Sequence, residues 1–117
     1  MRALLIGFAL AIGLAACSPT VSSLTLQPGE RFILGGPGDG SFHIDLANEG
    51  AVAVDVAEQR PDGEVVTLGL LEPGASLRAS FAAGAAAVLS NPSASAARVR
   101  AEIRGGGELS MVATDAD

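Results

Sequence analysis

Apolar and polar residues alternate with a period of two along most of the chain after Leu24. In one such run Phe42, Ile44 and Leu46 share a face, and the polar residues between them share the other. The same alternation recurs at 52–56, 77–81 and 99–103. Successive side chains of a strand point to opposite faces, so this pattern predicts strands with one buried face. Residues 65–71 are more continuously apolar and predict a central strand.

Turn sequences separate these runs at fairly even intervals, at 27–30, 48–50, 60–63, 72–74 and 105–107. Pro-Gly suits a type II turn, and Pro-Asp-Gly suits a type I turn with a glycine bulge. The alanine-rich stretch 82–97 contains Gly84 and Pro92, which disfavour a long helix, so it predicts a strand near 86–89 and a loop at 90–95. Seven to nine short strands joined in this way predict a single antiparallel β-sandwich, immunoglobulin-like by architecture alone.

The first sixteen residues follow a different pattern. Met1-Arg2 is a positive start, and 3–14 is an apolar run of about a dozen residues, typical of a signal peptide and too short to span a bilayer. The run ends in Leu14-Ala15-Ala16-Cys17, which resembles the lipobox of bacterial lipoproteins. That resemblance implies a diacylglycerol thioether on Cys17 and cleavage by signal peptidase II between Ala16 and Cys17.

The residue after the cysteine bears on which membrane a lipoprotein of this kind is sorted to. Ser18 stands where the Gram-negative family pattern has Asp in lipoproteins retained at the inner membrane, so the resemblance implies lipid anchoring at the outer membrane, facing the periplasm. Residues 18–23 are small, polar and contain Pro19, which predicts a short tether. The expected organisation is a signal peptide (1–16), lipidated Cys17 with its tether (17–23), a β-sandwich (24–114) and an acidic tail (115–117).

The composition limits the classes of partner that this chain is expected to bind. The chain carries thirteen Asp and Glu against seven basic residues, all arginine, and its net charge of −6 argues against nucleic acid. It has no Trp or Tyr, and Phe32, Phe42 and Phe81 are expected in the core, which leaves no aromatic platform for sugars or bases. Cys17 is the only cysteine. Its lipidation would remove disulfides, thiolate metal sites and cysteine catalysis from the mature domain, and no cofactor besides the lipid is expected.

His43 is the only histidine, and Asp45 follows it on the same predicted strand face. Two ligands at this spacing are a weak metal candidate, because a tight site needs three or four, so a solvated strand face is preferred. His43 could serve as a catalytic base for a serine, but the sequence contains no Gly-x-Ser-x-Gly elbow. The glycine-rich stretch 35–40 is similar to a calcium-binding repeat, but it is a single copy with Asp39 one position early, so a loop between strands is preferred.

Arginine is concentrated in one part of this acidic chain. Arg98, Arg100 and Arg104 share one face of a predicted strand, interrupted by Glu102, and Arg78 can lie on a neighbouring strand. The preferred interpretation is pairing with the protein's own carboxylates. The alternative is contact with an anion or a protein partner, since guanidinium binds carboxylate and phosphate bidentately.

These observations favour a non-catalytic envelope lipoprotein whose sandwich is a structural or protein-interaction module, with an unidentified envelope protein as its partner. The alternative is a lipoprotein that binds a small ligand, anion or metal through the His43/Asp45 face or the Arg98/Arg100/Arg104 stripe. A hydrolase is the third hypothesis.

Overall fold

A computed structural model describes residues 20–105 and 111–115, without the side chains of 112–115. Nine strands lie in these ranges: β1 (Thr20–Leu26), β2 (Glu30–Gly35), β3 (Phe42–Asn48), β4 (Val54–Gln59), β5 (Val65–Leu71), β6 (Ser76–Phe81), β7 (Ala86–Ser90), β8 (Ala97–Arg104) and β9 (Met111–Asp115). No helix in these ranges is long and apolar enough to cross a membrane. The predicted signal peptide at 1–16 and the lipidation site at Cys17 lie outside the described residues.

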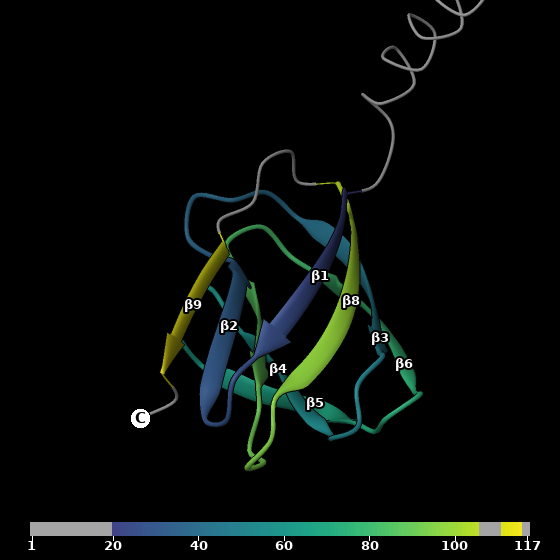
Figure 1. Cartoon of the computed structure of the whole chain (residues 1–117). Helices are drawn as coiled ribbons and strands as arrows, with labels where there is room; N and C mark the ends of the chain where they lie inside the picture. Colours follow the sequence, from purple (N-terminus) through teal and green to yellow (C-terminus); the bar gives the residue numbers. More distant parts are fainter. Residues whose placement is uncertain (1–19, 106–110, 116–117) are drawn as a thin grey trace, which may run out of the picture.

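The strands form two antiparallel sheets that face each other (Figure 1), which confirms the predicted all-β sandwich. One sheet has the order β1-β8-β3-β6, and the other has the order β5-β4-β7-β2-β9. Strands of the first half pair with strands of the second half in nested fashion, β1 with β8, β2 with β7, β3 with β6 and β4 with β5. This is the strand order of a jelly roll. The topology therefore differs from the immunoglobulin arrangement that was expected from architecture alone.

The predicted period-two faces meet between the sheets. Phe42, Ile44 and Leu46 are each 1 % exposed, and the alternate residues of β8 are equally buried. Phe42 lies opposite Phe81 on the neighbouring strand, and the two rings stack with centroids 4.9 Å apart. Phe32 is half-buried and packs against the same core. This apolar layer holds the sheets together and leaves their opposite faces to solvent.

Of the predicted turns, those at 27–30, 60–63 and 72–74 close with a backbone hydrogen bond. At 48–50 the chain instead bends with Gly50 N donating to the Asn48 side chain, and 106–107 lie outside the described residues. Glu30 N donates to Gln27 O (2.9 Å) with Gly29 at φ 77°, as a type II turn requires. In the turn at 60–63, Gly63 N donates to Arg60 O (2.8 Å), and Gly63 also has a positive φ. This is a type I turn followed by a glycine bulge.

The prediction of a central strand at 65–71 is wrong, because β5 is the edge of its sheet. Val65 is 60 % exposed and Leu70 is 51 % exposed, whereas Leu71 is buried. A continuous apolar run indicates burial on both faces only where a further layer covers the sheet. Here the described residues supply no such layer, so much of the run faces solvent.

The predicted domain boundaries also shift at both ends. The tether was expected to reach residue 23, but β1 begins at Thr20, which lies opposite Ile103 of β8. Only Ser18 and Pro19 separate Cys17 from this strand. Residues 20–23, three of them polar, resemble a linker because an edge strand buries little of its surface. At the other end β9 runs to Asp115, one residue into the predicted acidic tail.

Two asparagines are the buried polar residues of the described chain, and each ties a loop to the end of a strand. The Asn48 amide donates to Val52 O (2.8 Å) and Leu71 O (2.9 Å), which ties the β3–β4 loop to the end of β5. The Asn91 amide donates to Leu26 O (2.9 Å) and Ser95 O (2.8 Å), which ties the β7–β8 loop to the end of β1. Side-chain hydrogen bonds thus replace ladder bonds where the strands stop.

Candidate functional site

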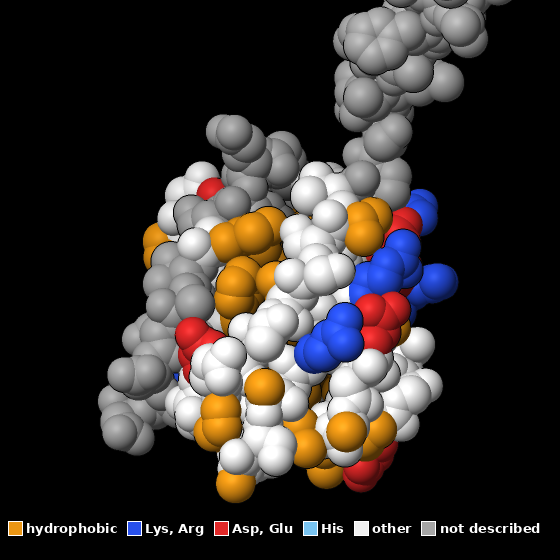
Figure 2. All heavy atoms as spheres, in the orientation of Figure 1, with side chains coloured by type: hydrophobic (Ala, Val, Ile, Leu, Met, Phe, Trp, Pro, Cys, Tyr) orange, Lys and Arg blue, Asp and Glu red, His pale blue; other side chains and the backbone are white. Residues whose placement is uncertain are grey.

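Most of the site residues predicted from the sequence lie on the outer face of the four-stranded sheet. Figure 2 shows arginine and acidic side chains side by side along one flank of the molecule, over β8. They lie there because β3, β6 and β8 each turn their apolar residues inward, so the alternate residues point to solvent. The sequence predicted this division for each strand separately.

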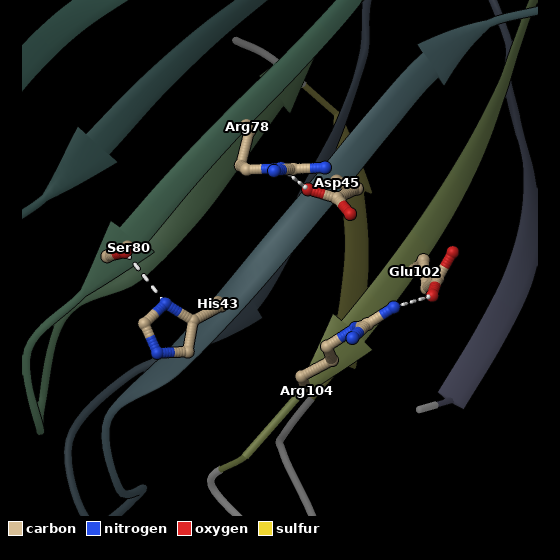
Figure 3. A pocket seen from close by; sticks show the side chains of 6 residues that line it. All are labelled: His43, Asp45, Arg78, Ser80, Glu102 and Arg104. Atoms are coloured by element: carbon tan, nitrogen blue, oxygen red, sulfur yellow. Dashed lines mark hydrogen bonds and ion pairs between the residues drawn. The ribbon is translucent and has the colours of Figure 1, made fainter. Parts of the chain in front are cut away.

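Register decides which of these side chains become neighbours. On β3, His43 lies between Ser80 of β6 and Arg104 of β8, and Asp45 lies between Arg78 and Glu102. Figure 3 shows these six side chains converging from the three strands. Residues directly opposite one another on β6, β3 and β8 form a row across the sheet. In the next row Ala47 lies between Ser76 of β6 and Arg100 of β8. The His43/Asp45 pair and most of the predicted arginine stripe therefore form a single surface, which we call the β3 face.

Two ion pairs cross this face (Figure 3). Arg78 Nε donates to Asp45 Oδ1 at 2.7 Å, and Arg104 Nη2 donates to Glu102 Oε2 at 2.6 Å. The hydrogen bond to Glu102, and next its Coulombic attraction, raise the pKa of Arg104 above its ordinary value, so this guanidinium stays charged. The preferred interpretation of the arginine stripe was pairing with the protein's own carboxylates. Arg78 and Arg104 are paired in this way.

Arg98 and Arg100 differ from those two arginines. Neither forms an ion pair with another residue of the described chain. Arg100 borders the β3 face beside Ala47, whereas Arg98 lies one row further along β8, opposite Thr25 of β1. The structure therefore brings Arg78, Arg100 and Arg104 together around β3 and leaves Arg98 outside that group.

His43 is engaged by a serine. Its Nδ1 atom lies 2.7 Å from Ser80 Oγ, with the donor set by the histidine tautomer, and both residues are exposed. In a Ser-His-Asp triad a carboxylate orients the imidazole, but here Asp45 bonds to Arg78. No cluster of three or more His, Cys, Asp or Glu side chains suited to a metal ion occurs among the described residues. The pair therefore has the geometry of a polar surface contact.

Two adjoining hollows occupy the β3 face. One, of about 220 Å³, is lined by His43, Asp45, Arg78, Ser80, Glu102 and Arg104. The other, of about 460 Å³, is lined by Asp45, Leu46, Ala47, Ser76, Leu77, Arg78, Arg100 and Glu102. They share Asp45, Arg78 and Glu102, so they form one groove along β3. The larger hollow exists because Ala47 and Ser76 have short side chains and lie among the longer side chains of Arg78 and Arg100.

Ala47 and Ser76 were not among the residues singled out from the sequence as contacts. A small side chain carries no chemical signal of its own, and its importance comes from the arginines that the register places around it. The glycine-rich stretch at 35–40 consists of the last residue of β2 and most of the connection to β3, as expected.

No protein-family model matches this sequence, and a search of curated proteins finds no match. Among solved structures the chain is similar to PirA, with 13 % identity and a TM-score of 0.55 over 72 % of this chain and 93 % of that one. It is also similar to Peruvianin-I, a cysteine peptidase from Thevetia peruviana latex, with 17 % identity and a TM-score of 0.58 over 83 % of this chain. A third similar structure is a sugar phosphate isomerase of the cupin superfamily from Silicibacter pomeroyi, with 16 % identity and a TM-score of 0.51 over 84 % of this chain.

The chain covers 57 % of the length of each of the last two structures. These likenesses concern the β-sandwich fold. They assign no activity, because one fold serves many unrelated functions.

Proposed function

We propose that this chain is a lipid-anchored lipoprotein of the cell envelope whose jelly-roll domain is a non-catalytic protein-interaction module. The observation that carries the anchor is the sequence Leu14-Ala15-Ala16-Cys17 at the end of an apolar leader. Two acyl chains on one cysteine hold a protein stably at a membrane. With Ser18 after the cysteine, the proposed address in a Gram-negative cell is the outer membrane, facing the periplasm.

The start of β1 sharpens this proposal. Ser18 and Pro19 are the residues between Cys17 and Thr20, and three extended residue steps reach about 10 Å. The sandwich would therefore stand directly on the membrane surface. A partner would be met at the sides of the domain, and the β3 face is such a side.

The non-catalytic part of the proposal is supported by the β3 face. His43 and Ser80 are exposed on a sheet surface, and the neighbouring carboxylates Asp45 and Glu102 are bound to arginines. General acid–base chemistry depends on groups whose protonation is tuned by burial or by an unpaired neighbour. Paired charges on an open sheet suit recognition better than proton transfer.

Membrane fractionation tests the anchor. Cys17→Ala should move the protein from the salt-washed membrane pellet to the soluble fraction, because the proposed lipid attachment is lost. Ser18→Asp is the matched variant: it keeps the cysteine, and in a Gram-negative host it should stay membrane-bound while shifting to the inner membrane on a density gradient. If Cys17→Ala still sediments with salt-washed membranes, the lipoprotein proposal is wrong.

Site-specific photocrosslinking in native envelopes tests the interaction module. A photoreactive residue replacing Ser23, which is exposed and lies opposite Arg100, should give a discrete adduct. The same residue replacing Thr67, exposed on β5 of the other sheet, serves as the control and should give none. Absence of an adduct at both positions would contradict the module while leaving the anchor standing.

A further inference from the structure

One arginine of the β3 face forms no ion pair with a carboxylate of the described residues. Arg100 forms no ion pair within the described residues, and it borders the larger hollow across from Arg78. Ala47 lies between Arg100 and Ser76 in the same row. The hollow therefore has a guanidinium on each side, a methyl group at its floor and a hydroxyl beside it.

The second guanidinium, that of Arg78, is held by one hydrogen bond and keeps its other N–H donors available. Arg78 donates its Nε to Asp45, and its side chain is 84 % exposed. Guanidinium has five N–H donors in a planar fork, so this bond leaves the terminal amino groups available. Asp45 therefore acts as a positioning residue that restrains the Arg78 fork beside the hollow.

The charge of the groove suggests the class of anion. The residues lining the two hollows include the arginines Arg78, Arg100 and Arg104 and the carboxylates Asp45 and Glu102, which leaves one net positive charge with His43 neutral. A carboxylate carries one negative charge, whereas a phosphate monoester carries about two at neutral pH. The groove is therefore better matched to one carboxylate at a time. A phosphate dianion would place both of its charges beside Asp45 and Glu102, whereas successive carboxylates of an extended peptide point to opposite sides.

We infer that the groove on the β3 face binds an acidic peptide segment of a partner protein, with a carboxylate side chain of that segment held between Arg78 and Arg100 over Ala47. The two hollows adjoin along β3, and successive rows of a sheet are about 7 Å apart, which suits an extended segment better than an isolated ion. His43 and Ser80 supply neutral hydrogen-bonding groups in the next row. This inference rests on the proposed interaction module and names the chemistry of its partner.

A blocked tetraglutamate peptide is the probe. It is titrated to millimolar concentration into isotopically labelled protein, purified in detergent from cells that express the full chain. Saturable chemical-shift changes are expected at the backbone amides of Ala47 and Ser76 and at the Arg78 Nε–H group, and they should weaken as salt increases. Blocked tetraglutamine should give none, and inorganic phosphate should bind more weakly than tetraglutamate.

Three variants locate the binding. Arg100→Gln should weaken the affinity for tetraglutamate about tenfold, the size expected for a lost charge-assisted hydrogen bond. Ala47→Leu keeps every charge but fills the floor of the hollow, so it should weaken binding at least as much. Arg98→Gln removes an equivalent charge from the same strand face outside the groove, and it should leave the affinity within about twofold of the unmodified protein.

The inference is overturned if tetraglutamate produces no saturable shifts at the β3 face. Equal losses in Arg98→Gln and Arg100→Gln, or full affinity in Ala47→Leu, would also overturn it, because both results indicate attraction to general positive charge. Tighter binding of phosphate would assign the groove to a different anion. None of these results alters the fractionation of Cys17→Ala, so failure here is distinguishable from failure of the lipoprotein proposal.

Discussion

Asn91 provides the sharpest quantitative test of how this sandwich is held together. Its side chain is 1 % exposed and makes four hydrogen bonds. The amide donates to Leu26 O and Ser95 O, and the side-chain oxygen accepts from the backbone N–H and the hydroxyl of Ser93. Its backbone also pairs with Gly29 and Glu30. Asn91 therefore links the β7–β8 loop to the turn between β1 and β2.

The magnitude follows from these contacts. A buried hydrogen bond contributes a net 0.5–1.5 kcal/mol, so four give roughly 2–6 kcal/mol. The Ser93 hydroxyl also bonds Ser95 O, so part of the network can persist without the asparagine. Asn91→Ala should therefore lower the free energy of unfolding by about 3 kcal/mol, which corresponds to a fall in Tm of roughly 12–24 °C for a domain of this size.

Urea unfolding followed by far-ultraviolet circular dichroism is the measurement, because a chain without Trp and Tyr offers no useful intrinsic fluorescence. Both proteins carry Cys17→Ala, so that a lipid does not contribute. The m-value should stay unchanged, since the surface exposed on unfolding is the same. Ser93→Ala, which keeps both amide bonds of Asn91, should cost about 1 kcal/mol. A loss below about 1 kcal/mol for Asn91→Ala would refute the reasoning and indicate that water replaces the amide.

Other substitutions test the packing and the polar face. Gly35→Ala should lower stability by about 2–3 kcal/mol, because Gly35 has φ 88° and an added Cβ would lie 2.8 Å from the Phe42 ring. Gly36→Ala, with φ 137° and no atom within 4 Å of the added Cβ, isolates the backbone strain; equal losses in the same urea assay would contradict the predicted clash. A double-mutant cycle on Arg78 and Asp45 should give a coupling below about 1 kcal/mol that decreases with added salt, because the pair is largely exposed. A larger, salt-independent coupling would mean that the pair contributes to the fold itself.

The strands were predictable because their signal is local. The buried residues of β3, Phe42, Ile44 and Leu46, occupy alternate positions, and that period is written directly in the chain. Turn chemistry is equally local, as Gly29 and Gly63 show. Where a residue's environment depends on a distant strand, the same reasoning failed: Val65 and Leu70 have the composition of a central strand but lie on an edge.

The candidate site was only partly predictable for a related reason. Alternation assigned His43, Asp45 and Arg100 to exposed faces, but alternation carries no information about register. That Ser80 meets His43, or that Ala47 lies beside Arg100, depends on pairings between residues 37 and 53 positions apart in the chain. No local pattern specifies these contacts.

The sequence alone determined the apolar run that ends in Leu14-Ala15-Ala16-Cys17, the two-residue period of the strands and most of the turns between them. Each of these is a property of neighbouring residues. The tertiary structure decided that the strands nest as a jelly roll, that β1 begins two residues after Ser18, and that Arg78 and Arg100 flank a groove over Ala47. These features depend on which strands lie side by side. Strand pairing is determined by the burial of all the apolar faces in one shared core, so it depends on the whole folded chain and not on any one segment.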